Sequence, residues 1–141
     1  MDHILEFAQD NLILAGIWVA LIIMLIYSFI APMLSAIKRV NNHEATLLIN
    51  KEDAIILDIR AQKDFKSGHI HGAKQIKPED VREGNFSQLE KDKNTPIIVV
   101  CAMGNLASGA ANKMSKQGFS NVSVLEGGMN AWQSASLPVS K

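Results

Sequence analysis

The sequence of 141 residues predicts an α/β domain, a parallel sheet flanked by helices, preceded by one N-terminal transmembrane helix. Two observations carry this prediction. Residues 11–37 contain no charged side chain, and after them short Ile- and Val-rich runs alternate with helical patterns. We therefore divide the chain into an N-terminal segment, residues 1–37, and a domain, residues 38–141, which is long enough to bury its own core.

The uncharged stretch is long enough to cross a bilayer. About twenty helical residues span a hydrocarbon layer of about 30 Å, so we expect a membrane helix over about 12–31. Trp18 and Tyr27 are expected toward the interfaces, and Pro32 is expected to kink or end the helix. A cleavable signal peptide is the alternative, but no Lys or Arg precedes the stretch and no Ala-x-Ala site follows it.

The charges on either side of this span predict its orientation. Acidic side chains precede it: Asp2, Glu6 and Asp10. Basic side chains follow it: Lys38, Arg39 and Lys51. The positive-inside rule then predicts a single-pass protein of the inner (cytoplasmic) membrane with residues 38–141 on the cytoplasmic side. The chain has one cysteine, which excludes an internal disulfide and agrees with a reducing compartment.

The first elements of the domain follow from caps and short apolar runs. A polar connector begins at Lys38, and Asn41 or Asn42 caps a helix. The apolar face of this helix is narrow: Ala45, Leu48 and Ile49. The run "AIILDIR" is a buried strand that ends at Asp58.

Glycines and prolines divide the stretch that follows. Gly68 and Gly72 break a short helical turn before a brief strand over 74–76. Pro78 then opens a polar stretch in which two short helices are separated at Gly84 and Asn85. This stretch is therefore expected to form short elements next to the longer strands of the sheet.

The second half holds two further strands, each followed by a helix. The strands are "PIIVVC" and "NVSVLEG". The helix "NLASGAANKMSKQGF" is expected to close at Gly118. Its apolar stripe is Leu106, Ala110, Ala111 and Met114. A last helix, "GGMNAWQSASLP", ends before Pro138.

Asp58 and Cys101 both fall at the carboxyl ends of predicted strands, where parallel α/β sheets bind ligands. A cysteine reacts as its thiolate, which a helix N-terminus and inward-pointing amides stabilise. The amides from Ala102 to Ala107 are candidates, and Gly104 lets the chain turn toward the sulfur. Spacing alone leaves a second interpretation open, in which Cys101 is a buried packing residue.

Three ordered motifs resemble the rhodanese-like domain family. The stretch "LDIRAQKDFKSGHIHGAKQI" resembles its opening signature, and "PIIVVCAMGN" resembles its active-site loop. "GFSNVSVLEGGMNAWQSASLPV" resembles its closing strand, double-glycine turn and Trp-bearing helix. The opening matches are Asp58, Arg60, Phe65, Gly68, His69, Ile70, Gly72 and Ala73. The resemblance covers roughly 40–139, and the whole chain is similar to membrane-anchored, single-domain bacterial members.

The resemblance implies sulfur transfer through Cys101, which would take a sulfane sulfur from a donor, hold it as a persulfide and pass it to a thiol or cyanide. No metal and no organic cofactor is implied. The substrate-binding residues would be those of the loop: Ala102, Met103, Gly104, Asn105, Leu106 and Ala107. The remaining motif residues are expected to be structural: Asp58, Arg60, His69, Gly127, Gly128 and Trp132.

The loop departs from the family at Leu106 and Ala107, where many active members carry an arginine followed by Ser or Thr. Loss of that cation weakens donor binding by about 1.5 to 3 kcal/mol, which disfavours thiosulfate and phosphoryl substrates. We therefore expect a small donor of low charge, or a thiol or protein persulfide.

A second function belongs to another class. A weak or inactive rhodanese module would serve as a protein-interaction domain tethered to the lipid bilayer. Ala15 and Gly16 would let its membrane helix approach other membrane proteins closely. A nucleic-acid partner is not expected, because the formal net charge is zero and charges of both signs are interspersed.

Overall fold

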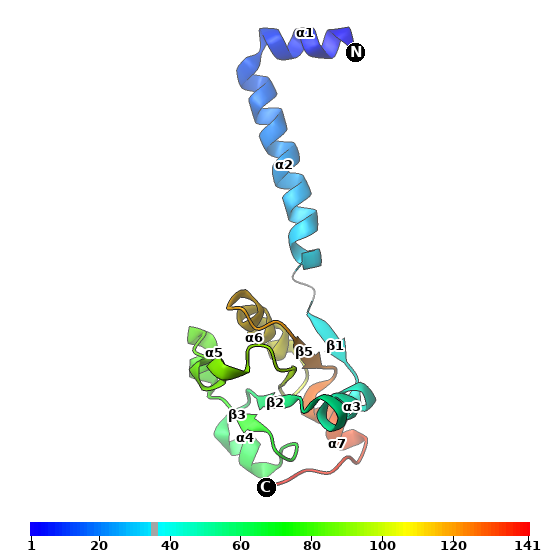
Figure 1. Ribbon diagram of the computed structural model, residues 1–141, viewed down its shortest axis with the longest axis vertical. Coiled ribbons are helices and arrows are strands. Elements are labelled where there is room, and N and C mark those ends of the chain that lie inside the picture. Colours follow the sequence, from blue (N-terminus) through cyan, green and yellow to red (C-terminus); the bar gives the residue numbers. More distant parts are fainter. Residues whose placement is uncertain (35–36) are drawn as a thin grey trace. The chain divides into compact units, whose positions relative to one another are not determined.

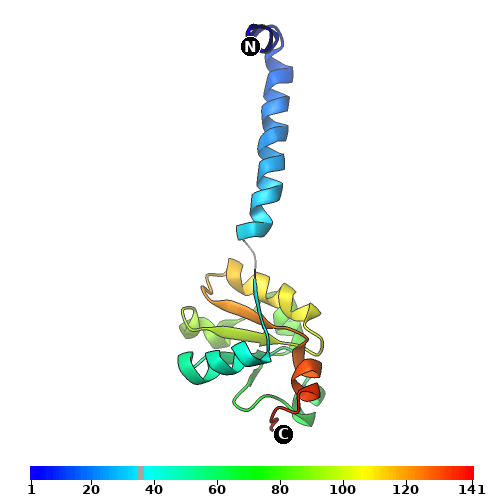
Figure 2. The same cartoon turned by 90° about the vertical axis from the view of Figure 1, so that its right-hand side faces the viewer.

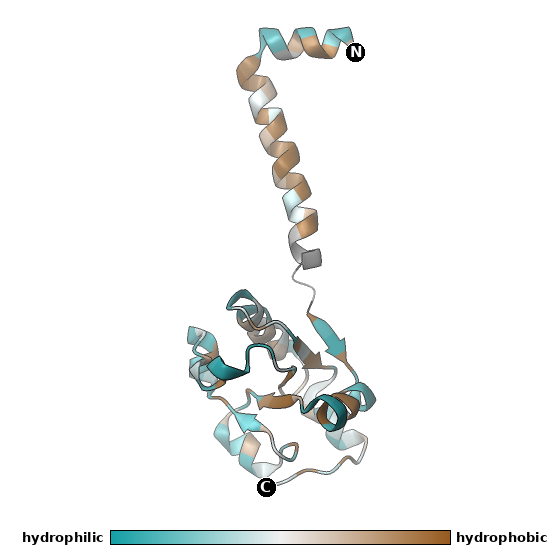
Figure 3. Cartoon of the chain, in the orientation of Figure 1, coloured by the Kyte–Doolittle hydropathy of each residue, from teal (hydrophilic) through white to brown (hydrophobic). Residues whose placement is uncertain are grey.

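The computed structural model describes residues 1–34 and 37–141 and divides the chain into two compact units, Met1–Ala36 and Ile37–Lys141. The first unit holds α1 (Asp2–Asp10) and α2 (Leu12–Leu34) (Figure 1). The segment Leu12–Ile30 of α2 is long and apolar enough to cross a membrane (Figure 3). Two details differ from expectation. α1 is not among the predicted elements, and α2 continues past Pro32 to Leu34.

The second unit is a five-stranded sheet in the order β1-β5-β4-β2-β3, in which every pairing is parallel. The strands are β1 (Lys38–Val40), β2 (Ile55–Asp58), β3 (Lys74–Gln75), β4 (Ile97–Val100) and β5 (Val122–Leu125). The helices are α3 (Asn42–Glu52), α4 (Gln62–Ser67), α5 (Pro78–Glu83), the 3-10 helix η1 (Ser87–Asp92), α6 (Asn105–Lys116) and α7 (Gly128–Ser134). The predicted parallel sheet flanked by helices is confirmed.

Helices cover both faces of the sheet (Figure 2, α6 in yellow and α3 in turquoise). One core cluster joins the sheet to α6 and η1, and a second joins it to α3 and α7. Successive residues of β4 alternate between the two, so Val99 belongs to the first and Val100 to the second. This burial on both sides explains why the central strand β4 is a continuous apolar run.

The start of α3 is fixed by a reciprocal cap. The Asn41 side chain accepts from the Glu44 amide at 2.9 Å, and the Glu44 carboxylate accepts from the Asn41 amide at 3.0 Å. Asn41 rather than Asn42 is therefore the cap. The strand β1 stands where the sequence predicts a polar connector. It pairs only with β5, and Val40 is its one buried residue.

Two predictions for α6 are wrong. Leu106 is 77% exposed, and the buried stripe consists of Ala107, Ala110, Ala111 and Met114. This set follows the i, i+3, i+4, i+7 spacing of one helix face, from which Leu106 is displaced by one position. The helix also ends earlier than expected. Its cap is Gln117, and Gly118 follows with a φ of +100°.

Candidate active site

Cys101 lies at the carboxyl end of the central strand β4, directly before the loop that leads into α6. Its side chain is 3% exposed and belongs to the core cluster on the α6 face of the sheet. The Gly104 amide donates a hydrogen bond to Sγ at 2.9 Å. Gly104 precedes α6 with a φ of +92°, so the chain bends back and presents its amide to the sulfur at the helix N-terminus.

A cavity of about 180 Å³ lies at the cysteine loop and is lined by Cys101, Ala102, Met103, Asn105 and Leu106. Its mouth is apolar, since Met103 is 65% exposed and Leu106 is 77% exposed. Two of the predicted substrate-binding residues, Gly104 and Ala107, do not line this cavity. The side chain of Ala107 is fully buried in the core.

The N-terminus of α7 holds the cysteine loop from the side opposite the sulfur. The Met129 amide donates to the Cys101 carbonyl at 2.8 Å, and the Asn130 amide donates to the Ala102 carbonyl at 3.0 Å. Gly128 makes this approach possible. It has a φ of +58°, and a Cβ there would overlap the Cys101 carbonyl oxygen. The preceding glycine, Gly127, has a φ of +73°.

Asp58 and Arg60 form a buried ion pair at the end of β2. Arg60 donates from Nη2 to Asp58 Oδ2 at 2.8 Å, and their side chains are 9% and 1% exposed. Nη2 also donates to the Gly68 carbonyl at 2.7 Å. The pair therefore links the strand to the residue that follows α4. Neither side chain lines the cysteine cavity.

His69 and Trp132 both attach the C-terminal segment to the domain. The His69 backbone exchanges two hydrogen bonds with Ser140, at 2.8 and 2.7 Å. Its ring stacks on Phe65 at 3.9 Å, and Nδ1 bonds to the Phe65 carbonyl at 2.8 Å. A carbonyl only accepts, so Nδ1 carries the proton. Trp132 is 4% exposed, and its indole nitrogen donates to the Pro138 carbonyl at 3.0 Å.

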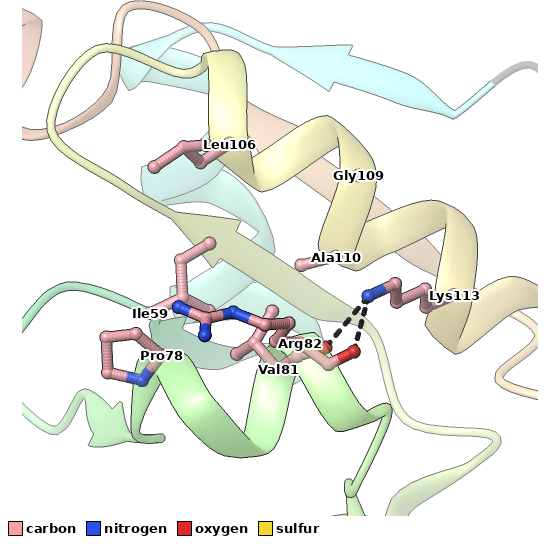
Figure 4. Close-up of a pocket in the computed structure, with 8 residues that line it drawn as sticks. All are labelled: Ile59, Pro78, Val81, Arg82, Leu106, Gly109, Ala110 and Lys113. Atoms are coloured by element: carbon pink, nitrogen blue, oxygen red, sulfur yellow. Dashed lines mark hydrogen bonds between the residues drawn. The ribbon is translucent and has the colours of Figure 1, made fainter.

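A second cavity, next to the cysteine cavity, is the feature that the sequence analysis missed. It has a volume of about 290 Å³, lies between α5 and α6, and has Arg82 in its lining (Figure 4). Nothing in the sequence distinguishes Arg82 from any other basic residue on a short polar helix. Over residues 1–34 and 37–141, no three His, Cys, Asp or Glu side chains are grouped to hold a metal ion.

Comparisons with known proteins agree with this geometry. Residues 41–135 match the rhodanese-like domain family. The chain is 37% identical to the Escherichia coli K12 protein YibN over 139 residues, which cover 99% of this chain and 97% of YibN. It is also 35% identical to the thiosulfate sulfurtransferase GlpE of Pseudoalteromonas translucida over 100 residues, which cover 71% of this chain and 92% of GlpE.

Solved structures show the same fold. The rhodanese-like domain of the Anabaena Alr3790 protein superposes with a TM-score of 0.63 at 31% identity, covering 72% of this chain and 77% of that one. A rhodanese-related protein from Thermoplasma volcanium superposes with a TM-score of 0.64 at 27% identity, covering 73% of this chain and 97% of that one. On the sheet order, the cysteine loop and these matches, the chain belongs to the rhodanese-like domain family.

Proposed function

We propose that the chain is a membrane-anchored, single-domain sulfurtransferase or persulfide carrier that acts through Cys101. One observation carries the proposal. Cys101 lines a cavity at the N-terminus of α6, and its sulfur accepts a hydrogen bond from the Gly104 amide. The named activity of the GlpE relatives supports it.

The reaction requires a nucleophilic sulfur, which Cys101 supplies. The Cys101 thiolate attacks the sulfane sulfur of a donor, the donor's own bond to that sulfur breaks, and the donor leaves with the electron pair. Cys101 then carries a persulfide. An acceptor thiolate attacks the outer sulfur and restores the Cys101 thiolate. The Gly104 amide and the α6 dipole stabilise negative charge on sulfur at both stages.

The composition of the loop supports a donor of low charge. None of the described residues that line the cysteine cavity is charged, and Leu106 stands where many active relatives carry an arginine. A dianion such as thiosulfate would lose hydration there without gaining an ion pair. A neutral or singly charged persulfide would lose less.

The anchor and its orientation are part of the proposal. α2 supplies a helix of sufficient length, and the basic residues after it favour a cytoplasmic domain. Protease treatment of inner-membrane vesicles of both orientations tests this. We expect digestion of the domain in inside-out vesicles and protection in right-side-out vesicles. The reverse pattern would place the domain outside the cytoplasm.

Intact-mass measurement tests the chemistry. The full chain, purified in a neutral detergent, is incubated with an organic persulfide or thiosulfate and then with a thiol. We expect a gain of one sulfur atom and its loss on thiol addition. Cys101→Ser, which removes the only cysteine, should gain none. Folded wild-type protein that gains no sulfur from any donor would disprove the proposal.

A second function is favoured by the exposed apolar rim of the cavity. Met103 and Leu106 are the side chains that a protein partner would cover, as in an interaction module without catalysis. Complementation of a deletion strain separates the two functions. An interaction module predicts that Cys101→Ser restores the phenotype while protein without residues 1–36 does not. A sulfurtransferase predicts that Cys101→Ser fails.

A further inference from the structure

The cavity between α5 and α6 lies next to the cysteine cavity. Leu106 lines both. Ile59, also in the lining, donates its amide to the carbonyl of Val100, the residue before Cys101, at 3.0 Å. Ile59 and Cys101 also belong to one core cluster. The two cavities therefore lie side by side at Leu106, and we call the cavity of about 290 Å³ the α5–α6 groove.

Most of the lining of the α5–α6 groove is apolar. Ile59, Pro78, Val81 and Leu106 supply its apolar walls, and Gly109 and Ala110 leave room because their side chains are small. From Leu106 to Lys113 the groove follows α6 for about 10 Å, at about 1.5 Å per residue. Its length and its volume of about 290 Å³ fit a small organic molecule.

Two basic residues line the α5–α6 groove, Arg82 and Lys113. In Figure 4 the Arg82 guanidinium points toward Ile59 and away from Lys113, whose Nζ donates to the carbonyls of Val81 and Arg82 at 3.2 and 2.9 Å. Among the described residues that line the groove there is no carboxylate, and over the same described ranges Arg82 forms no ion pair. The guanidinium is therefore available to an anionic ligand.

Building on the proposed function, we infer that the α5–α6 groove binds the carbon portion of the sulfur donor. The donor is an organic persulfide whose carbon portion carries a carboxylate. Its chain contacts Leu106 and Ile59, and its carboxylate pairs with Arg82. The groove thus supplies, at a distance, the cation that the loop lacks, and Arg82 selects among donors.

The transfer step is balanced without an oxidant or reductant. The Cys101 thiolate attacks the terminal sulfur of the persulfide R–S–SH. The S–S bond of the donor breaks as the new S–S bond to Cys101 forms, and R–S⁻ leaves with the electron pair. The transferred sulfur keeps its proton. The carboxylate of the departing thiolate remains paired with Arg82 until the product dissociates.

Single-turnover mass spectrometry of the full chain in neutral detergent tests the inference. Glutathione persulfide is the carboxylate-bearing probe, and the persulfide of 2-mercaptoethanol is the neutral one. We expect Arg82→Gln to slow sulfur uptake from glutathione persulfide about three- to tenfold more than uptake from the persulfide of 2-mercaptoethanol. Arg82→Lys keeps the positive charge and should retain most of the wild-type preference for glutathione persulfide. Arg39→Gln, which removes an exposed guanidinium outside the groove, should leave the preference for glutathione persulfide unchanged.

The outcomes separate this inference from the proposed function. Equal slowing of both donors by Arg82→Gln, or equal effects of Arg82→Gln and Arg39→Gln, would overturn the role of the groove while persulfide formation stands. Absence of sulfur uptake from both donors by the wild-type chain would overturn the proposed function. Added salt gives a second measurement on wild-type protein. It should slow uptake from glutathione persulfide more than from the neutral donor, and equal slowing would count against Arg82.

Discussion

The amide of Gly104 reaches the sulfur of Cys101 at 2.9 Å because Gly104 has a φ of +92°, which turns the chain back toward the end of β4. Residues with a Cβ rarely adopt this conformation. A Cβ on Gly104 would also lie 3.3 Å from the Gly127 nitrogen and 3.4 Å from the Leu125 oxygen. The hydrogen bond to sulfur and the packing of the loop therefore both depend on this glycine.

Gly104→Ala is expected to lower the free energy of unfolding by about 1 to 2 kcal/mol, because alanine is strained at positive φ. It should also slow sulfur uptake about tenfold by displacing one amide from the sulfur. Gly109→Ala is the control for stability. It lies within α6 with nothing within 4 Å of its added Cβ, so a gain of about 0.4 to 1 kcal/mol is expected. Urea unfolding and intact-mass kinetics measure both effects.

Gly128→Ala should lower the free energy of unfolding more than an alanine replacement of a glycine that also has a positive φ but has space for a Cβ. Its added Cβ would overlap the Cys101 carbonyl oxygen, and we expect a loss of about 3 kcal/mol or more. Gly72→Ala is the control, with a φ of +78° and nothing within 4 Å of the Cβ, and should cost about 1 to 2 kcal/mol. Similar unfolding midpoints for the two variants would show that α7 does not hold the loop.

Arg60→Gln is expected to destabilise the domain by about 3 to 5 kcal/mol, because it leaves the Asp58 carboxylate buried without its cation. The double variant with Asp58→Asn should recover part of this loss, since the buried charge is then absent. Lys93→Gln breaks the exposed pair with Glu90 and should change stability by less than about 1 kcal/mol. If urea unfolding gave the same decrease in the free energy of unfolding for Arg60→Gln and Lys93→Gln, burial of the Asp58–Arg60 pair would not explain its effect on stability.

Leu106→Arg should raise the rate of sulfur uptake from thiosulfate about ten- to a hundredfold by placing a cation beside the sulfur. No packing is lost, because Leu106 is 77% exposed. Leu106→Gln is the neutral control and should leave the thiosulfate rate within about threefold of the wild type, since it adds no charge. Intact-mass kinetics with thiosulfate provide the measurement, and the same gain with glutamine would contradict a charge effect.

Sequence patterns predict the elements that are buried on both sides. β2, β4 and β5 consist mostly of Ile, Val and Leu, and the sequence pattern places all three strands correctly. β1 is missed for the opposite reason. It is an edge strand of Lys38, Arg39 and Val40 with one buried residue, and three residues are too few to show a period of two.

The parts of the site that are contiguous in the sequence could be predicted, and the parts that depend on packing between helices could not. Cys101 and its glycine loop are contiguous, so motifs place them correctly at the end of a strand. Leu106 is assigned to the wrong face of α6 because alanines, which a hydrophobic pattern weights weakly, form the true core stripe. Arg82 becomes notable only when α5 packs beside α6, and no spacing along the chain encodes that arrangement.

The two carbonyls that α7 binds have a consequence for the rate of the reaction. With the Cys101 and Ala102 carbonyl oxygens both engaged, the peptide planes of the loop cannot rotate without breaking a hydrogen bond. The dipoles around the sulfur are thus already oriented before any donor arrives, and they stay oriented when charge moves off Cys101 and returns. In the proposed sulfur transfer, the loop therefore undergoes less reorganisation than water would undergo around the same sulfur.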